Sequence, residues 1–212
     1  MEITPDDFVL LLRGVAARIG AEQERLSELD RAIGDGDHGS SMEKGWQAAI
    51  AAIEVLPQPA GFQVLCNAAA RAFVNAVGGA TGPLYATLLM RGGAAVKERA
   101  SLDLDGMAAF LAAACQGIRE RGKSEAGDKT MLDAWLPAIA ALEAARAAGV
   151  RMDVALAEAA MAAEQGAEAT QHMVAKLGRA SRLGLRSQGH IDPGAASAAL
   201  FFRAFADGIA EA

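Results

Sequence analysis

The chain has 212 residues, of which 52% are hydrophobic and 22% charged, a balance typical of one globular domain with a full apolar core. A formal net charge of −6, without Lys/Arg runs and interleaved aromatic residues, argues against nucleic-acid binding. The two cysteines, Cys66 and Cys115, each lie in apolar sequence, which indicates buried reduced thiols and a cytoplasmic protein.

No membrane segment is expected. The N-terminus lacks the basic start and apolar run of a signal peptide. Residues 72–90 carry no charge, but Asn75 and the stretch Gly78–Pro83 break this apolar run in the middle. Two helix ends around a glycine turn explain the run better than a membrane span.

Helical spacing recurs along the chain, and no convincing alternating strand is present. The first predicted helix covers residues 4–28, with Pro5 at its start and an apolar stripe formed by Phe8, Leu12, Val15 and Ile19. The remaining predicted helices cover residues 39–55, 61–76, 81–100, 104–121, 130–148 and 152–175, and a last one begins at Pro193. Pro137 is expected to kink or shorten the helix that contains it.

Eight helices with short connections predict an all-α, single-domain antiparallel bundle that covers residues 1–212. In such a bundle alternate connections gather at the same end. These connections are the segments 30–39, 78–83, 122–130 and 176–193, and they hold most of the unusual sequence. We therefore expect the functional site at that end.

The first of these segments holds three carboxylates, Asp30, Asp35 and Asp37, within eight positions. Close carboxylates repel one another unless a positive group lies among them, and a hard divalent cation such as Mg²⁺ prefers oxygen ligands. The glycines between them permit close approach and unusual dihedrals. The stretch indicates a metal–phosphate site; the alternative is an ordinary turn in which Asp35 or Asp37 caps a helix.

Two other connections suit phosphate. The turn Gly78–Pro83 leads into a helix N-terminus, which favours anions, although a plain capped turn is the better explanation for this motif alone. Residues 176–190 contain no acidic residue and four basic ones: Lys176, Arg179, Arg182 and Arg186. This composition indicates either a phosphate-binding loop or a solvated basic loop. Walker A and dinucleotide-binding glycine motifs are absent.

Four segments together resemble one known family, in its order and over nearly the whole chain. They are Ala-Ile-Gly-Asp-Gly-Asp-His-Gly (32–39), Gly-Gly-Ala-Thr-Gly-Pro-Leu (78–84), Gly-Asp-Lys-Thr-Met-Leu-Asp-Ala (127–134), and Gly-Arg-Ala-Ser-Arg-Leu-Gly (178–184) continuing to Gly-His-Ile-Asp-Pro-Gly-Ala (189–195). The chain is similar to the DhaL-type family, the nucleotide-binding subunits and C-terminal domains of dihydroxyacetone kinases.

The resemblance implies an eight-helix antiparallel barrel with the nucleotide at one end. It implies that Asp30, Asp35 and Asp37 hold two Mg²⁺ ions and, with Arg179, carry the catalysis. The residues that it implies for binding ADP or ATP are His38, Gly39, Ser40, Ser41, Ala80, Thr81, Gly122, Met131, Arg179, Asp192, Pro193 and Gly194. For His38 the sequence favours a contact to phosphate or to loop backbone.

The resemblance also implies partners: a DhaK-type subunit that holds dihydroxyacetone, a DhaM-type phosphohistidine protein, and a transcription regulator. The alternatives are an ATP-exchanging kinase subunit for another short ketose or a tetrose, or a non-catalytic sensor of ADP and ATP. A helical enzyme for a diphosphate substrate, such as a terpenoid synthase, is disfavoured because no Asp-Asp-x-x-Asp motif is present.

Overall fold

Helices make up the regular structure of residues 1–211, the part of the chain that this computed structural model describes. The α-helices are α1 (Pro5–Ala21), α2 (Gln23–Ile33), α3 (His38–Glu54), α4 (Phe62–Ala76), α5 (Thr81–Ala95), α6 (Leu104–Gly122), α7 (Leu132–Ala147), α8 (Met152–Ala169) and α9 (Pro193–Ala210). Two 3₁₀ helices, η1 (Thr170–His172) and η2 (Ala180–Ser187), lie between α8 and α9. The prediction of an all-α chain is confirmed.

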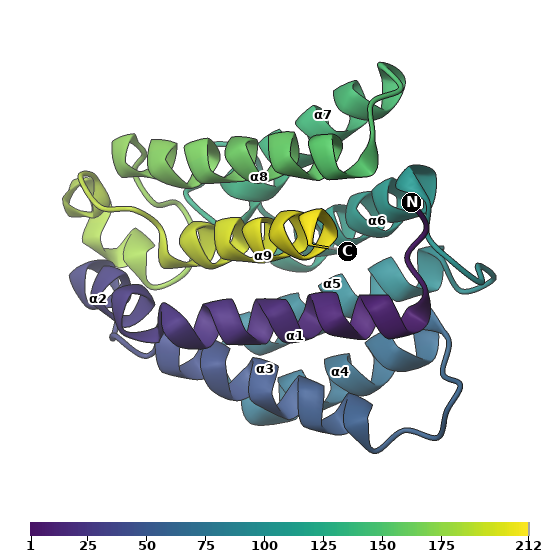
Figure 1. Cartoon of the computed structure of the whole chain (residues 1–212). Coiled ribbons are helices and arrows are strands. Elements are labelled where there is room, and N and C mark those ends of the chain that lie inside the picture. The colour runs from purple at the N-terminus through teal and green to yellow at the C-terminus, as the bar shows by residue number, and fades with distance from the viewer. Residues whose placement is uncertain (212) are drawn as a thin grey trace.

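Eight of the helices pack in a closed ring. From α3 to α9 each helix contacts the next one along the chain, α1 contacts α3, and α9 returns to contact α1. In Figure 1, α2 and the segment that precedes α9 lie at one end of this arrangement, and both termini lie toward the other.

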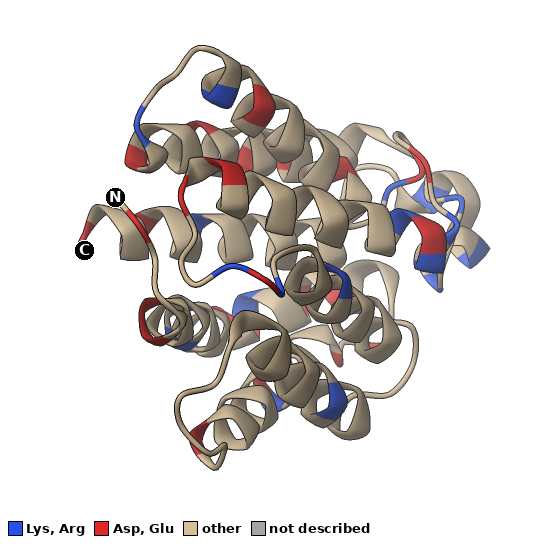
Figure 2. Ribbon diagram, turned by 90° about the vertical axis from the view of Figure 1, so that its right-hand side faces the viewer, with Lys and Arg blue, Asp and Glu red and all other residues tan. Residues whose placement is uncertain are grey.

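The ring encloses an aromatic core. Its largest side chains are fully buried and include Trp46, Trp135, Phe8, Phe110, Phe201 and Phe205. The rings of Phe201 and Phe205 stack with their centroids 4.5 Å apart. Both tryptophans of the chain lie in this core. Acidic and basic positions are interspersed over the helices and loops (Figure 2). Within residues 1–211 no helix is both long and apolar enough to cross a bilayer.

The prediction of one first helix over residues 4–28 is wrong. The helix breaks at Glu22, whose backbone (φ −101°, ψ 10°) ends α1 and starts α2. The chain bends there because α2 packs across α3 and α9 at the end of the bundle. Since α2 continues to Ile33, Asp30 lies in its last turn and not in a loop.

Other boundaries differ in the same way, because tertiary packing overrides local pattern. The helix expected to reach residue 100 ends at Ala95, and the chain then runs to Leu102, which forms an antiparallel bridge with Ile3. The helix expected to reach residue 175 ends at Ala169. Helix α7 continues past Pro137, and part of the expected loop 176–192 is the helix η2.

Candidate nucleotide and metal site

The connections expected to gather at one end do so. A cavity of about 700 Å³ is lined by residues of all four segments. Of the predicted site residues, those that line it are Asp30, Asp35, Asp37, His38, Ser41, Ala80, Thr81, Gly122, Met131, Arg179, Asp192, Pro193 and Gly194. Gly39 and Ser40 do not.

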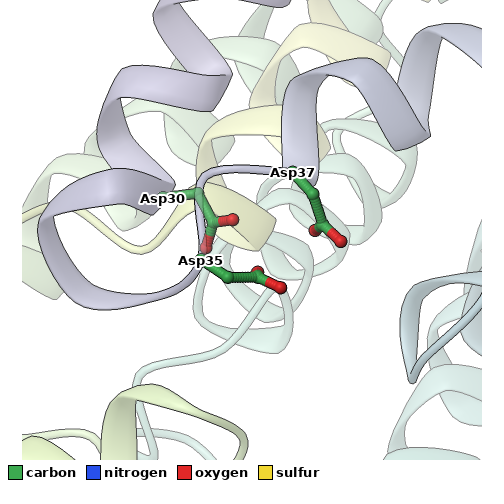
Figure 3. A group of neighbouring side chains, drawn as sticks. All are labelled: Asp30, Asp35 and Asp37. Carbon is green, nitrogen blue, oxygen red and sulfur yellow. The ribbon is translucent and has the colours of Figure 1, made fainter.

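The three aspartates converge from three elements (Figure 3). Asp30 comes from the end of α2, Asp35 from the loop and Asp37 from the N-cap position of α3, and each offers a carboxylate oxygen within 4.8 Å of the others. Asp37 makes no side-chain cap bond to α3. Its carboxylate therefore faces its neighbours instead of closing the helix, which disfavours the simple capping interpretation.

Glycine makes this convergence feasible. A Cβ at position 34 would overlap the Asp30 carboxylate, and Gly36 has φ +80°, which L side chains rarely adopt. Burial, followed by the charge of Asp35, raises the pKa of Asp37 above its usual range. The positive charge of Arg179 opposes part of this rise.

Arg179 supplies part of the missing positive charge. Its guanidinium forms an ion pair with Asp35, and its Nη1 lies 3.9 Å from Asp37 Oδ1. Arg179, Asp35 and Asp37 keep about half of their side-chain surface exposed, at 57%, 46% and 60% respectively. Solvent therefore screens these contacts, and the cluster stays open to the cavity.

The donor set fits Mg²⁺. The ion takes oxygen ligands and binds through few carboxylates while it keeps waters or substrate phosphates, and three convergent carboxylates at the mouth of an open cavity match this requirement. A soft metal is disfavoured because no sulfur or imidazole group belongs to the cluster among the described residues.

His38 lies beside the cluster, yet its ring is tied inward. Its backbone N–H donates to Asp30 Oδ2 at 3.2 Å, and its Nε2 lies 3.0 Å from Ser197 Oγ. Ser197 Oγ is also 3.1 Å from the Tyr85 hydroxyl. Burial lowers the pKa of His38 to about 4, so the imidazole is neutral at pH 7.

Gly39 and Ser40 shape the loop without lining the cavity. A Cβ at Gly39 would overlap the Gln23 carbonyl oxygen and lie 2.6 Å from Ser27 Oγ, so only glycine lets α3 start against α2. Ser40 Oγ donates to the Asp37 carbonyl at 3.0 Å. Both residues thereby position the aspartates, a function that the nucleotide-binding interpretation did not include.

Three helix N-termini reach the cavity. They belong to α3 at His38, α5 at Thr81 and α9 at Pro193. The N-cap side chains of α3 and α5 make no capping bond, and although the His38 amide donates to Asp30, the remaining amides and the positive dipole ends suit an anion. In α9 the Asp192 carboxylate accepts from the Ala195 amide at 2.8 Å. Burial raises the pKa of Asp192 to about 7, near physiological pH.

Lys129 is a cavity residue that sequence reasoning missed, although its motif was recognised. It is 1% exposed and has a positive φ of 61°. Its ammonium donates to the Thr170 carbonyl at 2.7 Å and to the His190 carbonyl. It thus joins the end of α8 to the segment that starts α9. Its unusual environment arises from long-range packing that local pattern does not encode.

The loop around Lys129 anchors its neighbours through two aspartates. Asp133 accepts from the amides of Gly127 and Thr130, at 2.5 and 2.8 Å, and so fixes the loop itself. Asp128 accepts from Lys176 Nζ at 2.9 Å, while its carbonyl accepts from the Lys176 amide at 3.1 Å. The loop therefore holds the start of the segment that carries Arg179.

Comparison with known proteins agrees with this geometry. The DAK2 domain family matches residues 32–207, which include Asp35, Asp37 and most of α9, and which begin two residues after Asp30. This chain belongs to the DAK2 domain family. The match runs from the end of α2 into the last turn of α9, so it covers the helical ring except for α1.

The relatives of this DAK2 chain carry informative names. It is 40% identical over 178 residues, 83% of each chain, to the "PEP-dependent dihydroxyacetone kinase, ADP-binding subunit DhaL" of Escherichia coli (strain K12). It is 38% identical over 194 residues to the "D-erythrulose kinase" of Mycolicibacterium smegmatis, and the matched region spans 33% of that kinase.

A solved structure shares the fold. The crystal structure of the dihydroxyacetone kinase from C. freundii in complex with AMP-PNP and Mg²⁺ matches 98% of this chain with a TM-score of 0.72 and 25% identity. This chain spans 34% of that kinase chain. A single domain of a longer kinase is therefore the counterpart of the DAK2 chain.

Proposed function

We propose that this chain is the nucleotide-binding subunit of a dihydroxyacetone kinase, of the DhaL type. It would pass phosphate through Mg²⁺-bound ADP and ATP to dihydroxyacetone held on a separate DhaK-type subunit. The observation that carries the proposal is the meeting of three convergent carboxylates, an arginine and three helix N-termini at one cavity of about 700 Å³. The identity to a subunit named for ADP binding adds support.

Each group would have a distinct task. Asp30, Asp35 and Asp37 would hold Mg²⁺, and we propose two ions. Bound Mg²⁺ supplies charge neutralisation for phosphate oxygens. Arg179, which forms an ion pair with Asp35, would donate its planar fork to a phosphate when metal holds the carboxylates.

The amides of the other segments would hold the nucleotide. The uncapped N-termini of α3 and α5, with the Thr81 hydroxyl, suit the phosphates. Gly122 and Met131, which also line the cavity, would contact the adenine. Asp192, Pro193 and Gly194 would close the wall over the nucleotide. We propose that residues 1–212 act as one such domain.

The proposal extends to partners. Besides the DhaK-type subunit, we propose a DhaM-type phosphohistidine protein that rephosphorylates bound ADP, contact with a transcription regulator, and a cytoplasmic location. The word "PEP-dependent" in the name of the Escherichia coli relative supports the phosphohistidine route.

A second candidate is an ATP-exchanging kinase subunit for a tetrose. The 38% identity to a D-erythrulose kinase supports it, and the nucleotide site would be the same. The two candidates differ only in the acceptor and in how firmly ADP is held.

Acid extraction of the purified protein, followed by chromatography, tests the proposal first. Near-stoichiometric ADP is expected for the coenzyme type. If none is released, calorimetric titration with ADP in the presence and absence of Mg²⁺ decides whether the site exists, and no Mg²⁺-dependent binding would refute it. Transfer to dihydroxyacetone or erythrulose with a DhaK-type subunit then identifies the acceptor; binding without transfer to either would favour a sensor.

A further inference from the structure

The basic segment, residues 176–190, has two sides. Residues 177–180, which include Arg179, line the cavity. Arg182, Leu185 and Arg186, on the helix η2, lie outside the cavity lining and are exposed. The segment therefore presents one set of groups to the nucleotide site and a second set to the surroundings.

The outward arginines differ from the other cations of the segment. Lys176 pairs with Asp128, and Arg179 pairs with Asp35. Within residues 1–211, Arg182 and Arg186 form no ion pair with a carboxylate and no side-chain hydrogen bond. Two positive charges without such partners thus lie four positions apart in sequence, on either side of the non-helical Gly184 (φ 55°), on a chain whose net charge is −6.

Leu185 lies between them and is 77% exposed, one of the most exposed large apolar side chains of the described chain. The backbone beneath it is fixed. Ser187 Oγ accepts from the Ala175 amide at 2.9 Å and donates to the Gly184 carbonyl at 2.7 Å. The Gly189 amide donates to the Gln171 carbonyl at 2.7 Å. A fixed backbone that holds an apolar side chain in water suits recognition, because little entropy is lost on binding.

We propose that Arg182, Leu185 and Arg186 form a docking surface for the protein that presents the phosphoryl acceptor, through an acidic surface with an apolar recess. The proposal rests on the proposed function, since only transfer to an acceptor held elsewhere requires such a partner. The acceptor must reach the cavity, and η2 adjoins residues 177–180 at its wall. On a chain of net charge −6, a patch of this kind favours the approach of an acidic partner at this place.

The test is charge reversal at both arginines, R182E/R186E, in the coupled transfer assay with a DhaK-type subunit. We expect the KM for the partner subunit to rise about tenfold or more, as for the loss of an interface hot spot. The kcat at saturating partner and the affinity for Mg²⁺–ADP should stay within about twofold. The partner KM of the wild type should rise with salt, and that of the variant should not.

Matched controls separate docking from general charge and folding effects. Arg71 of α4 is exposed and unpaired within residues 1–211, so R71E should leave the partner KM unchanged. L185S should raise that KM, whereas V55S, at a residue 82% exposed near the end of α3, should not. If R182E/R186E folds poorly, R182Q/R186Q gives the same comparison without charge reversal.

Two results would overturn the docking surface. One is an unchanged partner KM in R182E/R186E and in L185S. The other is a loss of Mg²⁺–ADP affinity in R182E/R186E equal to its loss of transfer, which would assign the arginines to the nucleotide. Failure of the wild type itself to bind Mg²⁺–ADP would refute the proposed function instead, so the two failures are distinguishable.

Discussion

Replacing Asp37 by Asn should stabilise the metal-free protein and abolish its response to Mg²⁺. The Asp37 carboxylate has two like-charged neighbours, each with an oxygen within 4.8 Å, and one counter-charge, Arg179, at 3.9 Å. Because its side chain is 60% exposed, the dielectric constant of water applies, and each of these interactions amounts to about 1 kcal/mol. Repulsion from two neighbours minus one attraction leaves a net cost of about 1 kcal/mol.

Thermal unfolding measures this cost. For a chain of this length about 1 kcal/mol corresponds to a rise in Tm of about 2–4 °C in D37N without metal. Adding Mg²⁺ with ADP should reverse the order. A ligand at a hundredfold excess over its Kd stabilises the wild type by about 2.7 kcal/mol. The variant, which lacks one of three carboxylates, should gain little.

A charge-matched control isolates the effect. Asp6 is exposed in the first turn of α1, at the far end of that helix from the aspartate cluster. The control is D6N, which changes the net charge by the same amount as D37N. Its metal-free Tm should not rise, and its response to Mg²⁺–ADP should match that of the wild type. A lower metal-free Tm in D37N, or a wild-type response to Mg²⁺–ADP, would show that the aspartates are not a repelled cluster awaiting a cation.

Three further substitutions probe the supports of the site. G39A should lower the free energy of unfolding by about 1–3 kcal/mol and weaken Mg²⁺–ADP binding, because the added Cβ would overlap the Gln23 carbonyl. The control G14A should do neither, because a Cβ at Gly14 of α1 has room. K129M should speed amide hydrogen exchange of residues 188–194 and lower ADP affinity; unchanged exchange would contradict the bridging role. In D192N the Asn side chain still caps α9, but the titration is lost. The pKa of Asp192 in the folded protein, about 7, exceeds the usual aspartate value of 3.8, so wild-type stability falls as the pH rises between these two values. The Tm of D192N relative to that of the wild type should therefore increase from pH 5 to pH 8.

Much of the site could be predicted because its chemistry is local in sequence. Asp30, Asp35 and Asp37 lie within one turn and its flanks, so any compact conformation brings their charges close. The gathering of four connections followed from the up-and-down order of the helices, since each helix reverses the direction of the chain. The apolar stripe of α1 likewise predicted which residues are buried.

What could not be predicted depends on contacts between distant segments. The break at Glu22 has no proline or strong local signal, and it arises because α2 packs across α3 and α9. The local sequence around Lys129 predicts an ordinary exposed lysine. In the structure its ammonium donates to the Thr170 and His190 carbonyls, 41 and 61 residues away. The hydrogen bond that holds the His38 ring toward the core likewise depends on Ser197, 159 residues away.

Several energetically unfavourable groups of this chain gather at one end of the molecule. Like-charged aspartates, a buried lysine with positive φ and a buried carboxyl with a raised pKa all adjoin one cavity. The rest of the bundle is closed by apolar and aromatic packing, which offsets those costs. Selection for stability alone would remove each of them, as the expected gain in D37N illustrates. Their retention in one place is best explained by a polyanionic, metal-bearing ligand, whose binding turns the repulsion among the carboxylates into affinity.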